Sequence, residues 1–115
     1  MPLIRLQTSV KMTEERQKNL LSSLSKIIAE KIGKPEHYVM VTIGDVSTMM
    51  SGTGGDAAFV EVRSIGGLNE EVNRAISAEL ASLLKISLGI SPERLYINFM
   101  DIAAVDWGWD GKTFG

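Results

Sequence analysis

The second residue of the chain, Pro2, could supply an unusual base. If an aminopeptidase removes Met1, which a residue as small as Pro2 permits, the mature chain begins with a secondary amine. A free α-amino group has a pKa of about 7.7 to 8.0, and an apolar pocket or a neighbouring cation lowers that pKa. Such an amine is a neutral base near physiological pH. On position alone, the alternative that Pro2 only stiffens the chain terminus stays open.

Other common catalytic groups are scarce. The 115 residues contain no Cys and a single His, His37. The absence of Cys excludes disulfides, thiolate metal ligands and a Cys nucleophile, and one His does not make a His-based metal cluster. Nothing in the sequence positions His37, so we assign it no catalytic role. We therefore predict no metal site.

Charge and hydropathy narrow the classes of partner. Twelve Lys and Arg residues stand against 14 Asp and Glu, the net charge is -2, and no basic run occurs. This charge pattern predicts no nucleic-acid partner. No apolar run reaches membrane-spanning length, and the N-terminus lacks the regions of a signal peptide. We expect a cytoplasmic protein that binds no membrane, and secretion by a route without a signal peptide stays open.

Alternating runs and helical patterns predict the elements that would position Pro2. Residues 3–8 and 39–45 alternate between apolar and other side chains, as strands with one buried face do. Between them lies a helical pattern that begins at the N-cap Thr13 and ends at Gly33. The first part of the chain is therefore predicted to form a β-α-β unit.

The second part of the chain repeats this order. Residues 59–64 alternate, a second helical pattern follows Asn69, and residues 95–101 alternate again. An offset of 56 residues maps one half onto the other, which we interpret as an internal repeat of residues 1–56 and 57–115 within a single domain. Each β-α-β unit has parallel strands and a right-handed crossover. The predicted fold is α+β, with a four-stranded mixed sheet and both helices on one face.

The opposite face of this sheet would be left uncovered. Alternation assigns a mixture of apolar and charged side chains to it: Leu3, Arg5, Gln7, Met40, Thr42, Phe59, Glu61, Arg63, Tyr96, Asn98 and Met100. A solvated face is one interpretation, because sheets often have one side in water. The large apolar members favour burial against another subunit, so we expect an oligomer.

Two segments have no periodic pattern. Residues 44–56 have the composition of a turn, but they lack the Lys-Ser/Thr ending and the following helix of a phosphate-binding loop. We interpret them as a mobile surface connection. Residues 103–115 contain both tryptophans, Trp107 and Trp109. These either pack on the edge of their own sheet or belong to a short strand that pairs with a neighbouring chain.

Five motifs, in their order and spacing along the whole chain, resemble the macrophage migration inhibitory factor branch of the tautomerase superfamily. They are Pro2 after Met1, Gly33-Lys34-Pro35, Ser64-Ile65-Gly66, the run from Ser91 to Phe99, and Gly108-Trp109. The resemblance implies a homotrimer with three sites at subunit boundaries. It also implies cofactor-free interconversion of the keto and enol forms of 2-oxo acids such as phenylpyruvate, with dopachrome-like compounds as an alternative substrate class.

The resemblance also assigns roles to residues. Pro2 would be the proton-transferring base, with Lys34 and the backbone of Ile65 on the substrate, and Tyr96 and Asn98 reaching in from the adjacent subunit. The implied pocket walls are Leu3, Tyr38, Trp107, Trp109 and Phe114. These roles suit a reaction that needs a base near C3, an acid near the carbonyl oxygen and a cation for the carboxylate. Lys34 would also be favoured simply by its position at a helix C-terminus.

The sequence departs from the family pattern in ways that change the prediction. Animal members carry a Cys-x-x-Cys pair where this chain has residues 57–60, so a thiol-redox activity is excluded. Trp107 stands where a smaller aliphatic residue is common, which predicts a narrower pocket. Relatives that decarboxylate or dehalogenate use additional arginines, for which Arg5 and Arg63 are candidates only if they face the site. A non-catalytic, cytokine-like interaction protein is the alternative from a different class.

Overall fold

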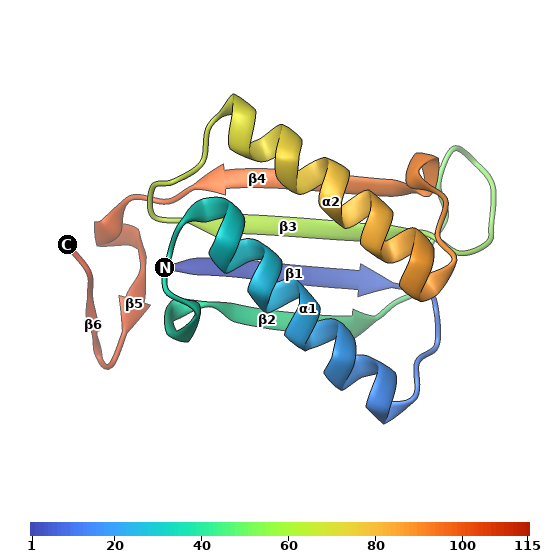
Figure 1. Cartoon of the computed structure of the whole chain (residues 1–115), viewed down its shortest axis with the longest axis horizontal. Coiled ribbons are helices and arrows are strands. Elements are labelled where there is room, and N and C mark those ends of the chain that lie inside the picture. Colours follow the sequence, from blue (N-terminus) through green and yellow to red (C-terminus); the bar gives the residue numbers. More distant parts are fainter.

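The computed structural model describes residues 1–115 and consists of two long helices packed on a four-stranded sheet (Figure 1). The strands are β1 (Pro2–Thr8), β2 (Met40–Asp45), β3 (Ala58–Ser64) and β4 (Leu95–Asp101), and the helices are α1 (Glu14–Ile32) and α2 (Glu70–Leu88). Three short 3-10 helices and a hairpin complete the chain: η1 (Glu36–Tyr38), η2 (Pro92–Arg94), η3 (Ala104–Asp106), β5 (Gly108–Trp109) and β6 (Lys112–Thr113). Neither long helix is apolar enough to cross a membrane.

The sheet has the order β2-β1-β3-β4. β1 is parallel to β2 and β3 is parallel to β4, whereas β1 and β3 are antiparallel. Both helices cover the same face (Figure 1), which confirms the predicted mixed sheet of two β-α-β units. In this register Pro2 pairs with Ser64, which in turn pairs with Asp101. The beginning of β1 therefore lies beside the ends of β3 and β4.

The predicted helix boundaries are confirmed by their capping bonds. The side chain of Thr13 accepts a hydrogen bond from the backbone N–H of Arg16 at 3.2 Å, and that of Asn69 accepts one from Val72 at 2.9 Å. Each helix ends at a glycine in the left-handed region, where a residue without Cβ is favoured. Because Gly33 turns the chain at the end of α1, the following residues are directed back toward the beginning of β1.

The core lies between the helices and the sheet. Ile4, Leu6, Val60 and Val62 are fully buried, as the alternation predicts. The residues assigned to the opposite face pair with one another across the strands, for example Leu3 with Met40. This face carries no covering element of the chain, so its burial in an oligomer stays a prediction.

The two halves have matching elements. β3 begins and ends 56 residues after β1, as α2 does relative to α1 and η2 relative to η1. The two halves therefore share one local architecture. Their origin from an internal duplication stays a prediction.

Arg94 anchors the segment between β2 and β3. The sequence pattern of this segment, which we interpreted as a mobile connection, did not predict this role of Arg94. The Arg94 guanidinium donates to five backbone carbonyls, at 3.0 to 3.3 Å, of Met50, Thr53, Gly54, Gly55 and Asp56. An arginine with its donors distributed in this way holds a segment that has few hydrogen bonds of its own. The segment lies at the opposite end of the sheet from Pro2.

Candidate active site

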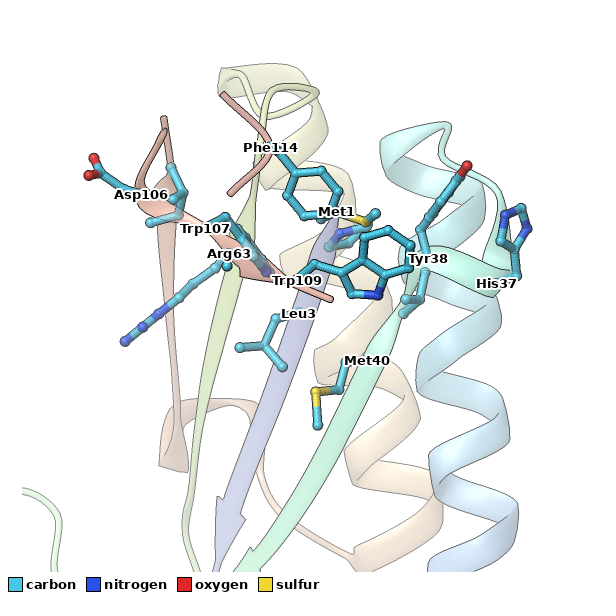
Figure 2. A pocket seen from close by; sticks show the side chains of 14 residues that line it. Met1, Leu3, His37, Tyr38, Met40, Arg63, Asp106, Trp107, Trp109 and Phe114 are labelled. Atoms are coloured by element: carbon cyan, nitrogen blue, oxygen red, sulfur yellow. The ribbon is translucent and has the colours of Figure 1, made fainter. Parts of the chain in front are cut away.

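A cavity of about 600 Å³ lies at the end of the sheet where β1 begins (Figure 2). Its walls come from the beginning of β1, from η1 with the beginning of β2, and from the C-terminal hairpin. Pro2 and all five side chains named as pocket walls line this cavity: Leu3, Tyr38, Trp107, Trp109 and Phe114. The fold therefore brings together segments from both ends of the sequence.

Pro2 is buried and lines the cavity. With Met1 present its nitrogen is an amide and no base. The carbonyl oxygen of Met1 accepts a hydrogen bond from the backbone N–H of Ile65 at 3.4 Å. The Ile65 N–H is thus directed at the group attached to the Pro2 nitrogen, and removal of Met1 would leave this donor facing the same space.

The electrostatics at this end of the sheet favour a neutral amine. Partial burial, and secondarily the positive charge of Lys34, lower the pKa of the Met1 amino group below its usual value. Lys34 does not line the cavity itself, but its charge acts at the chain terminus. The same two causes would act on an amine at Pro2 after removal of Met1.

Gly67 allows the segment after β3 to pass close to the end of α1. It has φ +83°, and a Cβ built there would lie 2.6 Å from the Ile32 side chain and 3.7 Å from Cε of Lys34. A larger residue would push these segments apart. The glycine therefore keeps the Ile65 backbone and Lys34 near the same end of the sheet.

The C-terminal hairpin forms one wall of the cavity and lies beside the beginning of β1 (Figure 1). β5 pairs with β6 of its own chain, so the short predicted strand has an internal partner. The rings of Trp109 and Phe114 are stacked, with centroids 5.8 Å apart and planes 10° apart. Trp109 and Tyr38 both line the cavity, from different segments of the chain (Figure 2). An aromatic or planar ligand would suit this arrangement.

Tyr96 and Asn98 do not reach this cavity within one chain. Tyr96 pairs with Phe59, five positions along β3 from Ser64, the residue opposite Pro2. At about 3.3 Å per strand residue this is a separation of roughly 17 Å. Tyr96 instead lines a second cavity of about 520 Å³ at the other end of the sheet. Any contact of Tyr96 with a Pro2 must therefore involve a second copy of the chain.

Several lining residues were not predicted from sequence as pocket residues: His37, Val39, Met40, Ile102, Asp106 and Gly108. His37 packs on Tyr38 with ring centroids 4.0 Å apart, and its ring lies on the far side of Tyr38 from Trp109 (Figure 2). The alternation pattern places Met40 on the same sheet face as Leu3, so this pattern could have identified Met40 as a neighbour of the site. Nothing in the local sequence indicates Ile102 or Asp106, which follow β4.

The two arginines considered for decarboxylation or dehalogenation both interact with Glu61. Arg63 lies at the cavity, and its guanidinium donates to Glu61 at 2.9 Å. Arg5 does not line the cavity and lies 3.9 Å from the other Glu61 oxygen. Of these two candidates, only Arg63 lines the cavity within this chain, and Glu61 accepts a hydrogen bond from its guanidinium. No group of three or more His, Cys, Asp or Glu side chains is arranged to hold a metal ion.

Comparisons with known proteins agree with this fold. The sequence model of the macrophage migration inhibitory factor family matches residues 1–115. A macrophage migration inhibitory factor homolog of Trichuris trichiura is 42% identical over 99% of this chain and 100% of its own length. The corresponding Trichinella spiralis protein is 38% identical over the same shares.

Two solved structures have nearly the same fold. The macrophage migration inhibitory factor homologue of Prochlorococcus marinus superimposes with a TM-score of 0.92 at 39% identity, covering 98% of this chain and 99% of that one. The macrophage migration inhibitory factor-like protein of Entamoeba histolytica has a TM-score of 0.94 at 30% identity, covering 98% of both chains.

Proposed function

Because the chain belongs to the macrophage migration inhibitory factor family, we propose that it is a cofactor-independent keto-enol tautomerase of 2-oxo acids such as phenylpyruvate. The family lies in the tautomerase superfamily, which is consistent with an isomerase. In this proposal Pro2 is the general base after removal of Met1. The proposed site needs no metal or organic cofactor, because the reaction only moves a proton between carbon and oxygen.

One observation carries the proposal. Pro2 lines the cavity, and the Ile65 N–H points at the Met1 carbonyl group, which is bonded to the Pro2 nitrogen. Removal of Met1 would therefore free a base and a hydrogen-bond donor that face the same space. A substrate oxygen could then accept the hydrogen bond that the Met1 carbonyl accepts in the present chain.

The proposed reaction is a proton transfer in two directions. In the ketonisation of an enol, the neutral Pro2 amine takes the proton from the enol oxygen and then donates it to C3, so the amine ends neutral. In the reverse direction neutral Pro2 takes the proton from C3, the electron pair of the C–H bond forms the enolate, and Pro2 returns the proton to the enolate oxygen. The Ile65 N–H and the charge of Lys34 would stabilise the negative oxygen or the carboxylate. Tyr38, Trp109 and the other walls would hold the aromatic ring of phenylpyruvate.

A homotrimer would complete the site. Tyr96 and Asn98 are separated from Pro2 of their own chain, whereas the uncovered sheet face offers a surface for a neighbouring copy. Sedimentation equilibrium of the purified protein tests this part directly. A monomer at micromolar concentration would contradict it.

The base role is tested by comparing chains with and without Met1. Intact-mass measurement identifies each form, and the decay of phenylpyruvate enol absorbance reports turnover. We expect the Met1-retaining form to lose about 10²-fold or more in kcat/KM, since general base catalysis contributes about 10²- to 10⁴-fold. Equal sedimentation and equal thermal midpoints of the two forms serve as controls. Full activity with Met1 in place would defeat the proposal.

The alternative of a different class is a non-catalytic interaction protein, which the names of the rat and mouse relatives suggest. It predicts negligible turnover of a panel of 2-oxo acids by the Met1-free form, together with saturable binding to a protein partner. A decarboxylase or dehalogenase is disfavoured because Glu61 engages the guanidinium of Arg63.

A further inference from the structure

Arg63 has an unusual position at the cavity. Arg63 lines the cavity beside Leu3, and the two residues pair in the antiparallel register of β1 and β3. Its guanidinium, however, donates to Oε2 of Glu61 at 2.9 Å. Figure 2 shows the side chain running away from Trp109 and Phe114. The charge of Arg63 is therefore directed away from the aromatic part of the cavity.

Glu61 is placed to hold Arg63 there. The two residues are two apart on β3 and therefore share one face of the sheet. The Glu61 side chain is only 19% exposed, and its other carboxylate oxygen lies 3.9 Å from Arg5. A partly buried carboxylate needs a partner, because its desolvation is otherwise uncompensated. The Glu61 carboxylate thus lies between the guanidinium groups of Arg5 and Arg63 and interacts with both.

We propose that Glu61 is a specificity-determining residue that withholds the Arg63 cation from the cavity and so restricts the site to ligands with a single carboxylate. The proposal builds on the proposed function, in which one ligand carboxylate lies near Lys34. It adds that a second carboxylate finds no cation while Glu61 engages Arg63.

Release of Arg63 would change this selectivity. An arginine can bind a carboxylate through two parallel hydrogen bonds, so a freed Arg63 would favour a dicarboxylic acid. The Arg63 side chain is 41% exposed, and ion pairs of such exposure are weak. Within the single chain this ion pair is therefore weak, and we expect one substitution at Glu61 to release Arg63.

The test uses binding and does not depend on turnover. Both tryptophans of the chain, Trp107 and Trp109, line the cavity, so their fluorescence reports occupancy. Phenylacetate and phenylmalonate share one ring and differ by one carboxylate. We expect Glu61→Gln to raise the affinity for phenylmalonate about fivefold and to change that for phenylacetate less than about twofold. The Glu61→Gln/Arg63→Gln double variant should lose this gain.

Arg63→Gln in the otherwise unchanged chain is a second, independent test. Glu61 keeps Arg5 as a partner in this variant, so the fold is expected to survive, as thermal melting would verify. We expect phenylacetate affinity to stay within about twofold. A loss of tenfold would show that Arg63 already binds the ligand carboxylate and would overturn the proposal. An unchanged ratio of the two affinities in Glu61→Gln, or no binding of either acid, would overturn it as well.

These outcomes can be separated from failure of the proposed function. A chain without enol turnover in which Glu61→Gln still shifts the affinity ratio retains the specificity role and loses only the catalytic one. A chain with full turnover and an unshifted ratio retains the tautomerase proposal and loses the role of Glu61.

Discussion

The two halves of the chain build the same elements but use them differently. In the first half the strand begins at Pro2, which lies at the cavity. The corresponding strand of the second half begins at Ala58, whose nitrogen is an ordinary amide inside the chain and which lies at the opposite end of the sheet. Equal local architecture therefore does not imply equal chemistry, because only a strand at the chain terminus can present an amine.

The residues that follow the two helices differ in the same way. Gly33 and Gly89 both end a helix in the left-handed conformation. The next residue is the half-buried Lys34 in the first half and Ile90, only 2% exposed, in the second. One position supplies a charge near the cavity and the other fills the core.

The last residues of the two corresponding 3-10 helices complete the comparison. Tyr38, at the end of η1, lines the cavity, whereas Arg94, at the end of η2, anchors the segment between β2 and β3. The first half thus turns its helix end toward the cavity. The second half uses the same backbone to stabilise the structure.

Substitution of the two strand-initiating residues should give the largest contrast. Pro2→Gly in the Met1-free chain removes the rigid secondary amine, and we expect kcat/KM for phenylpyruvate enol to fall about 10²-fold. Ala58→Gly is the matched control and should change kcat/KM less than about twofold, with a stability cost of about 0.5 to 1 kcal/mol from the added backbone freedom. The enol absorbance assay measures the first effect and urea unfolding the second. Comparable losses of activity in both variants would remove the asymmetry between the halves.

The residues after the helix caps should separate stability from ligand binding. Ile90→Ala leaves a cavity in the core and should lower the free energy of unfolding by about 2 to 5 kcal/mol. Lys34→Ala should change it by no more than about 0.5 kcal/mol, because this side chain is only half-buried. Urea unfolding at one fixed protein concentration makes the comparison. A Lys34→Ala chain as unstable as Ile90→Ala would mean that Lys34 is structural.

Substitution of Arg94 should affect the segment between β2 and β3 more than the rest of the molecule. Arg94→Ala removes the donors to five backbone carbonyls, and we expect a loss of about 1 to 2 kcal/mol in unfolding free energy. Amide hydrogen exchange of residues 46–57 should become faster, while that of β1 stays the same. Tyr38→Ala, at the matching position, should leave this exchange unchanged. Unaltered exchange in Arg94→Ala would show that the segment is ordered by other contacts.

The smallest expected effect is a shift in pH dependence. Burial and Lys34 lower the pKa of the Met1 amino group. The same causes acting on the amine of Pro2 after removal of Met1 would keep the proposed base neutral at lower pH than an ordinary amine. As pH falls through this lowered pKa the base is protonated, and kcat/KM decreases. Lys34→Gln removes one of the two causes, which raises the pKa and moves the acid limb of the profile to higher pH. His37→Asn is the control and should leave the acid limb of the pH profile unchanged. An unchanged acid limb in Lys34→Gln would show that the charge of Lys34 does not affect the pKa of the base.

Much of the fold follows from local patterns. Thr13 and Asn69 predict where the two helices begin, and the glycines after them predict where the helices end, in agreement with the structure. Alternation in the strands predicts which face of the sheet is buried. These features depend on residues a few positions apart, whose hydrogen bonds and burial periodicity are nearly independent of the rest of the molecule. The resemblance to a family added the residues of the cavity walls, which periodicity does not distinguish from core residues.

Caps, periodicity and motif spacing depend on residues close together in the chain, so the amino-acid sequence was enough to predict the elements, their order and the family. The packed molecule was needed to show that Ile102 and Asp106 border the cavity, that Arg94 binds five carbonyls, and that Arg63 turns to Glu61. These contacts join segments far apart in sequence, and their direction depends on side-chain packing across several strands. Local patterns contain no information on which partner a long side chain reaches once the sheet has formed.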